Sequence, residues 1–130
     1  MASPSPRYVA LIGDLVASRD LAPKVRKDLQ RYLKEWLQVL NDEFAKELAA
    51  PLTLTAGDEI QGLLRKPAAL VPVVQDLMER MFLFESQPRM LWGAGCGLLT
   101  TGRIPAPPRQ ADSPALLDGP AFHNARAALE

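Results

Sequence analysis

Two amphipathic segments divide this sequence, and they constrain its fold more than any other feature. Apolar residues recur at intervals of three and four over residues 25–48 and again over residues 70–84, a spacing that predicts one helix in each segment. Pro23 suits the first turn of the first helix, and Pro51 marks its stop. We expect the second helix to cover residues 67–86, since its prolines lie near its start.

Short apolar runs flank these helices and predict four strands. The first run lacks alternation, as expected of a central strand that is covered on both faces. The second and third runs are separated by Gly57-Asp58-Glu59, which has the spacing and composition of a tight hairpin with Asp58 at its tip. The fourth run contains three glycines. The four runs are residues 8–12, 52–56, 60–64 and 89–99.

The order strand, helix, strand, strand, helix, strand is typical of the ferredoxin-like split βαβ arrangement (βαββαβ) of the α+β class. We therefore expect an antiparallel sheet with its first and third strands central and two helices over one face. An additional C-terminal helix is expected to open at Gly119-Pro120, after a proline-rich loop over residues 104–114. Residues 1–130 are expected to form one domain, and the uncapped last helix indicates a missing continuation or a partner.

The composition limits the classes of protein to which this chain can belong. Basic and acidic residues both number 15, so the chain has no general attraction for nucleic acid. Although 48% of the residues are hydrophobic, no apolar run approaches the roughly 20 residues that span a bilayer. The single cysteine, Cys96, cannot form an internal disulfide and is expected to be an inert thiol in the core. These features predict a cytoplasmic protein without a nucleic-acid or membrane partner.

Two aspartates are candidates for a metal site. In the expected topology the end of the first strand lies beside the hairpin tip, which brings Asp14 and Asp58 together. Two carboxylates at one sheet edge suit Mg²⁺ or Mn²⁺, with water and substrate phosphates completing the coordination. The alternative is that Asp14 only ends a strand and Asp58 is a common turn residue.

Three motifs carry a resemblance to known families. They are Ala-Leu-Ile-Gly-Asp-Leu-Val-Ala-Ser-Arg at residues 10–19, Leu-Thr-Ala-Gly-Asp-Glu-Ile-Gln-Gly-Leu-Leu at residues 54–64 and Asp-Gly-Pro-Ala-Phe-His-Asn-Ala-Arg at residues 118–126. Together they look like the SatD family, over nearly the whole chain. Their order also resembles the palm-like catalytic domain of class III nucleotidyl cyclases, whose two metal-binding aspartates occupy positions like Asp14 and Asp58.

The cyclase resemblance implies a phosphate-binding turn after the first aspartate. Backbone at Leu15, Val16, Ala17 and Ser18, together with Gly57, would then meet the phosphates of a nucleotide. The Gly and Phe of the corresponding cyclase turn are replaced here. The glycine-rich residues 93–102 are similar to the cyclase strand that precedes the last motif, although close packing of a strand on a helix explains them equally well.

Asn124 and Arg126 are the catalytic candidates that this resemblance implies. Cyclases place an Asn and an Arg on the last helix, where they steady the reacting phosphates. Aligned on Gly119, His123 and Ala127 take those two places. Asn124 and Arg126 are therefore one residue out of register, a rotation of about 100 degrees on a helix.

The resemblance favours a domain that binds a nucleoside triphosphate with Mg²⁺ or Mn²⁺ between Asp14 and Asp58. SatD membership itself implies no particular reaction. One alternative is a catalytically inactive interaction or regulatory module of the same fold, which pairs with itself as a homodimer or with another protein. A second alternative is an active nucleotidyl cyclase or nucleotidyltransferase, which would need the missing arginine from a second chain.

Overall fold

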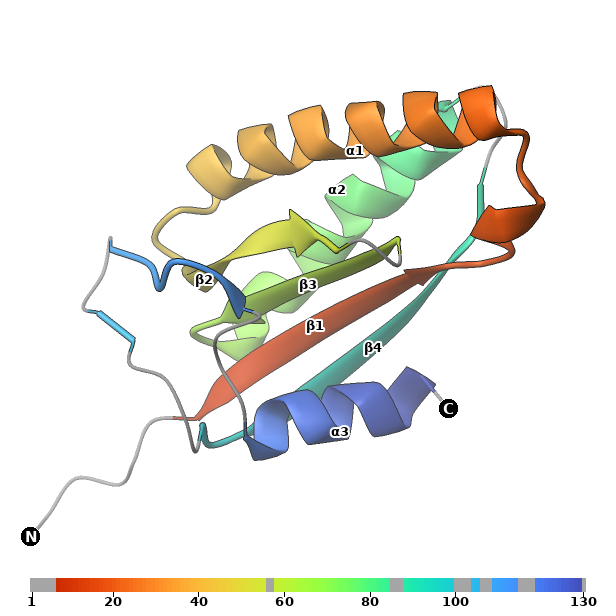
Figure 1. The fold of residues 1–130 in the computed structure, drawn as a ribbon. Helices are drawn as coiled ribbons and strands as arrows, with labels where there is room; N and C mark the ends of the chain where they lie inside the picture. Colours follow the sequence, from red (N-terminus) through yellow and green to blue (C-terminus); the bar gives the residue numbers. More distant parts are fainter. Residues whose placement is uncertain are drawn as a thin grey trace, which may run out of the picture.

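The structure, a computed structural model, describes residues 7–55, 58–84, 88–99, 104–105, 109–114 and 119–129. In these ranges the strands alternate with helices in the predicted order (Figure 1). The strands are β1 (Tyr8–Leu15), β2 (Leu48–Leu54), β3 (Glu59–Leu64) and β4 (Met90–Gly97), and the helices are α1 (Pro23–Glu43), α2 (Leu70–Leu83) and α3 (Pro120–Leu129). Short 3₁₀ turns at Ser18–Asp20 and Pro67–Ala69 precede α1 and α2.

The sheet has the order β2-β3-β1-β4, and every neighbouring pair of strands is antiparallel. Strands β1 and β3 are therefore central, as the sequence predicts. Helices α1 and α2 lie over one face of the sheet, and α3 lies against the other (Figure 1). The predicted α+β split βαβ fold with an additional C-terminal helix is confirmed.

The side chains of β1 contribute to two cores. Leu11 and Leu15 belong to the larger core, which α1 and α2 cover with a set of buried leucines. Ala10 and Ile12 belong to a smaller core with Ala121, Phe122 and Ala125 of α3. Because successive residues of a strand point to opposite faces, both parities of β1 must be apolar. This requirement explains the continuous apolar run at the start of the chain.

The first helix is shorter than the sequence predicts. It ends at Glu43, with Phe44 as its C-cap, and Leu48 already belongs to β2. Spacing did not reveal this boundary because Leu40, Phe44 and Leu48 continue the helical interval and all contact the larger core. Pro51 lies within β2 rather than before it, which is possible because β2 is an edge strand and its proline need not donate to a neighbour.

Other boundaries moved by a few residues. Strand β1 continues to Leu15, so Asp14 lies inside the strand and not after it. Strand β4 covers Met90–Gly97, a shorter span than the predicted 89–99, and the regular part of the second helix covers Leu70–Leu83. Part of the predicted proline-rich loop, and residues 85–86 at the predicted end of the second helix, lie outside the described residues.

Three glycines of β4 allow α3 to pack directly on the strand. A Cβ on Gly95 would overlap the backbone of Ala121 and Ala125, and a Cβ on Gly93 or Gly97 would also meet α3. The glycine-rich strand therefore serves strand–helix packing, one of the two readings of the sequence. Cys96 alternates with these glycines and points to the opposite face, where it is exposed. The prediction of a core thiol was wrong.

Candidate functional site

The predicted acidic residues lie where β1 ends and β3 begins. Asp14 is the Cα partner of Glu59 in the β1–β3 ladder. The amide of Leu15, one residue further along β1, donates to the carbonyl of Asp58 at 3.3 Å. Asp14 and Asp58 therefore belong to neighbouring strands at the same end of the sheet.

The consecutive residues Asp58 and Glu59 turn to opposite faces. The carboxylate of Asp58 contacts α1, whereas that of Glu59 contacts α3. Residues directly opposite each other in an antiparallel ladder share a face, so Asp14 shares the α3 face with Glu59 and is exposed there. The side chains of Asp14 and Asp58 thus start from different faces of the sheet.

Asp58 is buried and accepts hydrogen bonds from three side chains. Its side chain is only 1% exposed. Arg26 Nε donates to Oδ2 at 2.7 Å, Gln30 Nε2 donates to Oδ1, and the Ser18 hydroxyl donates as well. Burial alone would raise the pKa of Asp58, but these hydrogen bonds and the charge of Arg26 together hold that pKa below its ordinary value. Asp58 is therefore an ionised buried carboxylate.

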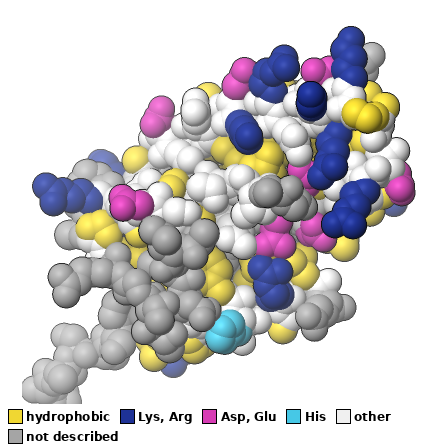
Figure 2. Space-filling model, in the orientation of Figure 1, with side chains coloured by type: hydrophobic (Ala, Val, Ile, Leu, Met, Phe, Trp, Pro, Cys, Tyr) yellow, Lys and Arg dark blue, Asp and Glu magenta, His cyan; other side chains and the backbone are white. Residues whose placement is uncertain are grey.

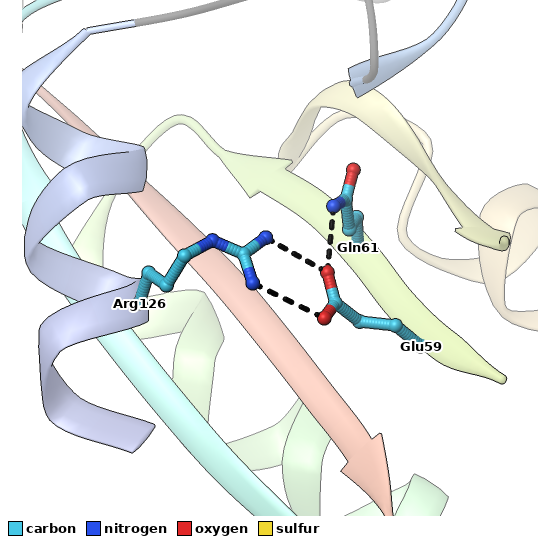
Figure 3. Close-up of polar contacts among 3 residues, drawn as sticks. All are labelled: Glu59, Gln61 and Arg126. Atoms are coloured by element: carbon cyan, nitrogen blue, oxygen red, sulfur yellow. Dashed lines mark hydrogen bonds and ion pairs between the residues drawn. The ribbon is translucent and has the colours of Figure 1, made fainter. Parts of the chain in front are cut away.

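Glu59 is held in a similar way on the other face (Figure 3). Both Nη atoms of Arg126 on α3 donate to the Glu59 carboxylate, at 2.9 Å to Oε1 and 3.3 Å to Oε2. Gln61 Nε2 donates to Oε1 at 2.7 Å. Burial would raise the pKa of Glu59, but the bonds from Arg126 and Gln61 and the arginine charge lower it. Each acid is thus paired with one arginine and one glutamine.

The turn after β1 was predicted to meet phosphates through its backbone. The amides of Leu15 and Val16 already donate to the carbonyls of Asp58 and Arg89. No acceptor among the described residues is recorded for the amides of Ala17 and Ser18. Ala17 has a positive φ of 54° and turns the chain into the 3₁₀ segment. Gly57, the remaining candidate, lies outside the described residues.

The catalytic candidates of α3 make contacts within the chain. Asn124 Nδ2 donates to the carbonyl of Cys96 on β4 at 3.0 Å. The guanidinium of Arg126 is engaged by Glu59. In this arrangement Asn124 ties the middle of α3 to β4, and Arg126 ties the last turn of the same helix to β3.

The structure tests whether Asp14 and Asp58 fit one metal ion as they stand. Asp14 offers an exposed carboxylate. Both oxygens of Asp58 hold donors from α1, and its side chain faces away from Asp14. For the two to share an ion, Asp58 would have to release Arg26 and Gln30. Among the described residues no three His, Cys, Asp or Glu side chains are grouped closely enough to hold a metal. A shared ion stays a prediction.

The sequence analysis missed Arg26, Gln30, Glu59 and Gln61. A signal for the first pair was present, because residues four apart on a helix lie on one face. Glu59 and Gln61 are two apart in a strand and so share a face. What the sequence could not provide was the partner on another element, since Arg26 and Asp58 are 32 residues apart along the chain.

Comparisons with known proteins add a family to this geometry. The model of the SatD family matches residues 8–130. The chain belongs to the SatD family. No protein in a search of curated sequences matched this SatD chain significantly.

Solved structures of cyclases share the fold of this SatD chain. A bacterial light-regulated adenylyl cyclase has 14% sequence identity and a TM-score of 0.66, covering 95% of this chain and 69% of the cyclase. The adenylyl cyclase CyaB from P. aeruginosa has 15% identity and a TM-score of 0.66, with 92% and 69% covered. The guanylate cyclase domain of RhGC from Catenaria anguillulae, solved with GTP, has 17% identity and a TM-score of 0.61, with 98% and 74% covered.

At these identities the likeness shows the fold alone. The predicted resemblance to a class III cyclase palm is confirmed at that level. In the described part of the SatD chain, no helix is long and apolar enough to cross a membrane.

Proposed function

We propose that this SatD chain binds a nucleoside triphosphate together with Mg²⁺ or Mn²⁺ at the sheet end where Asp14, Asp58 and Glu59 lie. The main support is that several charged side chains lie close together at this end of the sheet. The exposed carboxylate of Asp14 lies beside two acids, Asp58 and Glu59, each of which is paired with an arginine. A metal–triphosphate complex needs carboxylate oxygens for the cation and positive donors for the phosphates.

The charges near this site are arranged for such a ligand. Arg26 approaches from α1 and Arg126 from α3, so cations flank the acids on both faces of the sheet. Lys and Arg side chains also gather along α1, with carboxylates among them (Figure 2). The amides of Ala17 and Ser18 lie in the turn that follows Asp14. A cyclase of the same fold was solved with GTP, which supports a nucleotide as the ligand class.

Asp14 is the metal-binding carboxylate in this proposal. It needs no rearrangement, because it is exposed at the end of β1. A bound Mg²⁺ would supply charge neutralisation for the phosphates. Asp58 becomes a second ligand only if its contacts with α1 are broken. We also propose that the protein acts in the cytoplasm.

Calorimetric titration with ATP and GTP, with and without Mg²⁺, tests the proposal. We expect wild-type binding to require Mg²⁺ and Asp14→Asn to weaken it by about tenfold or more, since the variant removes one charged metal ligand. Asp42→Asn is the matched control, because Asp42 is an exposed aspartate at the other end of α1. No binding by folded wild type, or equal binding by Asp14→Asn, would contradict the proposal.

The interaction module remains a second candidate because of an apolar row on α2. Val71, Met78, Phe82 and Leu83 of this helix are all more than half exposed. Exposed apolar patches of this kind mark protein contacts. Absence of nucleotide binding, combined with concentration-dependent self-association in sedimentation, would favour a homodimeric module of the same fold.

Asn124 and Arg126, the groups that the cyclase resemblance implies for catalysis, are bonded to Cys96 and Glu59 within the chain. An active cyclase would need equivalent groups from a second chain.

A further inference from the structure

The two arginines at the candidate site are held in different ways. Glu59 engages both Nη atoms of Arg126, which closes the forked end of that guanidinium. Asp58 engages Arg26 through Nε. No acceptor for the two Nη groups of Arg26 is recorded among the residues that the structure describes. Among the described residues, the forked end of the Arg26 guanidinium, which can bind phosphate in a bidentate manner, is thus unoccupied.

The two side chains of the Arg26–Asp58 ion pair differ in burial. The side chain of Asp58 is 1% exposed, and that of Arg26 is 34% exposed. The Arg26 side chain is therefore anchored at Nε and only partly covered. A side chain anchored in this way loses less conformational entropy on binding a ligand than a free surface arginine does.

Asp58 is itself fixed by its surroundings. Gln30 and Ser18 donate to the same carboxylate. Its amide donates to the carbonyl of Thr55 at 3.1 Å, and its carbonyl accepts from Leu15. These bonds leave the carboxylate poorly placed to leave α1 for a metal ion. They make it a rigid support for Arg26.

We propose that Arg26 is the phosphate-binding cation of this site and that Asp58 is a positioning residue, which holds Arg26 by Nε so that its Nη groups face the ligand. The assignment of the ligand as a nucleoside polyphosphate rests on the proposed function. Recognition of the polyphosphate chain by Arg26 requires no metal, so it is testable apart from that function.

Inorganic tripolyphosphate in the presence of EDTA is the direct probe. We expect calorimetry to show that Arg26→Gln weakens tripolyphosphate binding by about tenfold or more, a loss of about 1.4 kcal/mol. Arg26→Lys keeps the charge without the fork and should recover only part of the affinity. Arg31→Gln, which removes an exposed positive charge from the same helix, should change the affinity less than about threefold.

The variant Asp58→Asn distinguishes a positioning role of Asp58 from a purely electrostatic effect of its charge on phosphate binding. Removing a negative charge near an anion site should strengthen binding if charge alone matters. If Asp58 positions Arg26, the same variant should weaken tripolyphosphate binding several-fold, because an amide holds the guanidinium less firmly. Circular dichroism melting of each variant ensures that folded protein is compared. Tighter binding by Asp58→Asn would overturn the positioning role.

Nuclear magnetic resonance of wild type keeps the test independent of any folding defect. We expect the Nε–H signal of Arg26 to stay protected from exchange while the Nη signals shift during titration with tripolyphosphate. Unchanged Nη signals at saturation, or equal binding by folded Arg26→Gln, would overturn the inference. Arg26-dependent binding of tripolyphosphate without any Mg-nucleotide binding would contradict the proposed function and support this inference. Mg-nucleotide binding of equal affinity in wild type and in Arg26→Gln would support the proposed function and contradict this inference.

Discussion

The contrast between Asp14 and Asp58 shows how burial decides the role of a carboxylate. The sequence presents the two aspartates as equals, each at the end of an apolar run. In the structure Asp14 is exposed, whereas Asp58 is buried among donors and has a positive φ of 60°. Aspartate tolerates that left-handed backbone better than most residues. Asp58 therefore suits a structural position at the hairpin, where its charge is stabilised by the fold.

The stabilised charge of Asp58 predicts how the free energy of unfolding depends on pH. The folded-state pKa of Asp58 is lowered, so its contribution to stability is complete above the unfolded value of about 3.9 and is lost as pH falls through the folded value. We expect Asp58→Asn to reduce the free energy of unfolding by about 2–4 kcal/mol at pH 7. The difference from wild type should shrink below about pH 4.

Urea unfolding at a series of pH values, with EDTA present, measures this difference. Asp42→Asn, a change at an exposed aspartate, should show little difference from wild type at any pH. A difference for Asp58→Asn that stays constant down to the acid limit of folding would show that ionisation of Asp58 does not stabilise the protein.

At the scale of elements, the sequence predicted order better than boundaries. Short apolar runs identified β1–β4, and Gly119-Pro120 indicated the start of α3. Helical spacing identified α1 and α2. It placed the end of α1 too late, since Phe44 and Leu48 continue the helical interval after the helix has ended. The site was less predictable. Asp14 and Asp58 were identified from the sequence, whereas Glu59 was missed, and Arg26, Gln30 and Arg126 reach the two paired acids from other elements. From the sequence, the glycines of β4 could allow the close approach either of a ligand or of a helix. In the structure they pack against helix α3.

The packing of α3 on β4 gives a prediction for Gly95. A Cβ at this position would overlap helix backbone, which has no flexible side chain that could move aside. We expect Gly95→Ala to lower the free energy of unfolding by about 1–3 kcal/mol, as overpacking does. Ala94→Ser, at the exposed neighbouring position, should change it by less than about 0.5 kcal/mol. Equal unfolding midpoints for wild type and Gly95→Ala would mean that α3 lies further from β4.

The whole molecule is a sheet between two unequal layers. The core under α1 and α2 contains many large buried leucines, whereas the core under α3 consists largely of alanines with Ile12, Leu63 and Phe122. Burial of apolar area stabilises in proportion to that area, at about 25 cal/mol per Å². The α3 layer therefore gains less from burial than the other layer, and polar contacts such as Glu59–Arg126 have a larger share in holding it.

This inequality predicts that α3 opens before the rest of the fold. Amide hydrogen exchange should give residues 121–129 a smaller opening free energy than the amides of β1 and β3, because local opening exposes only the smaller core. Glu59→Gln should lower the α3 value further by up to about 1 kcal/mol, the range of a partly exposed ion pair. The same variant should leave the β1 amides nearly unchanged. If α3 and β1 instead exchange with one common free energy, the two layers unfold as a single cooperative unit.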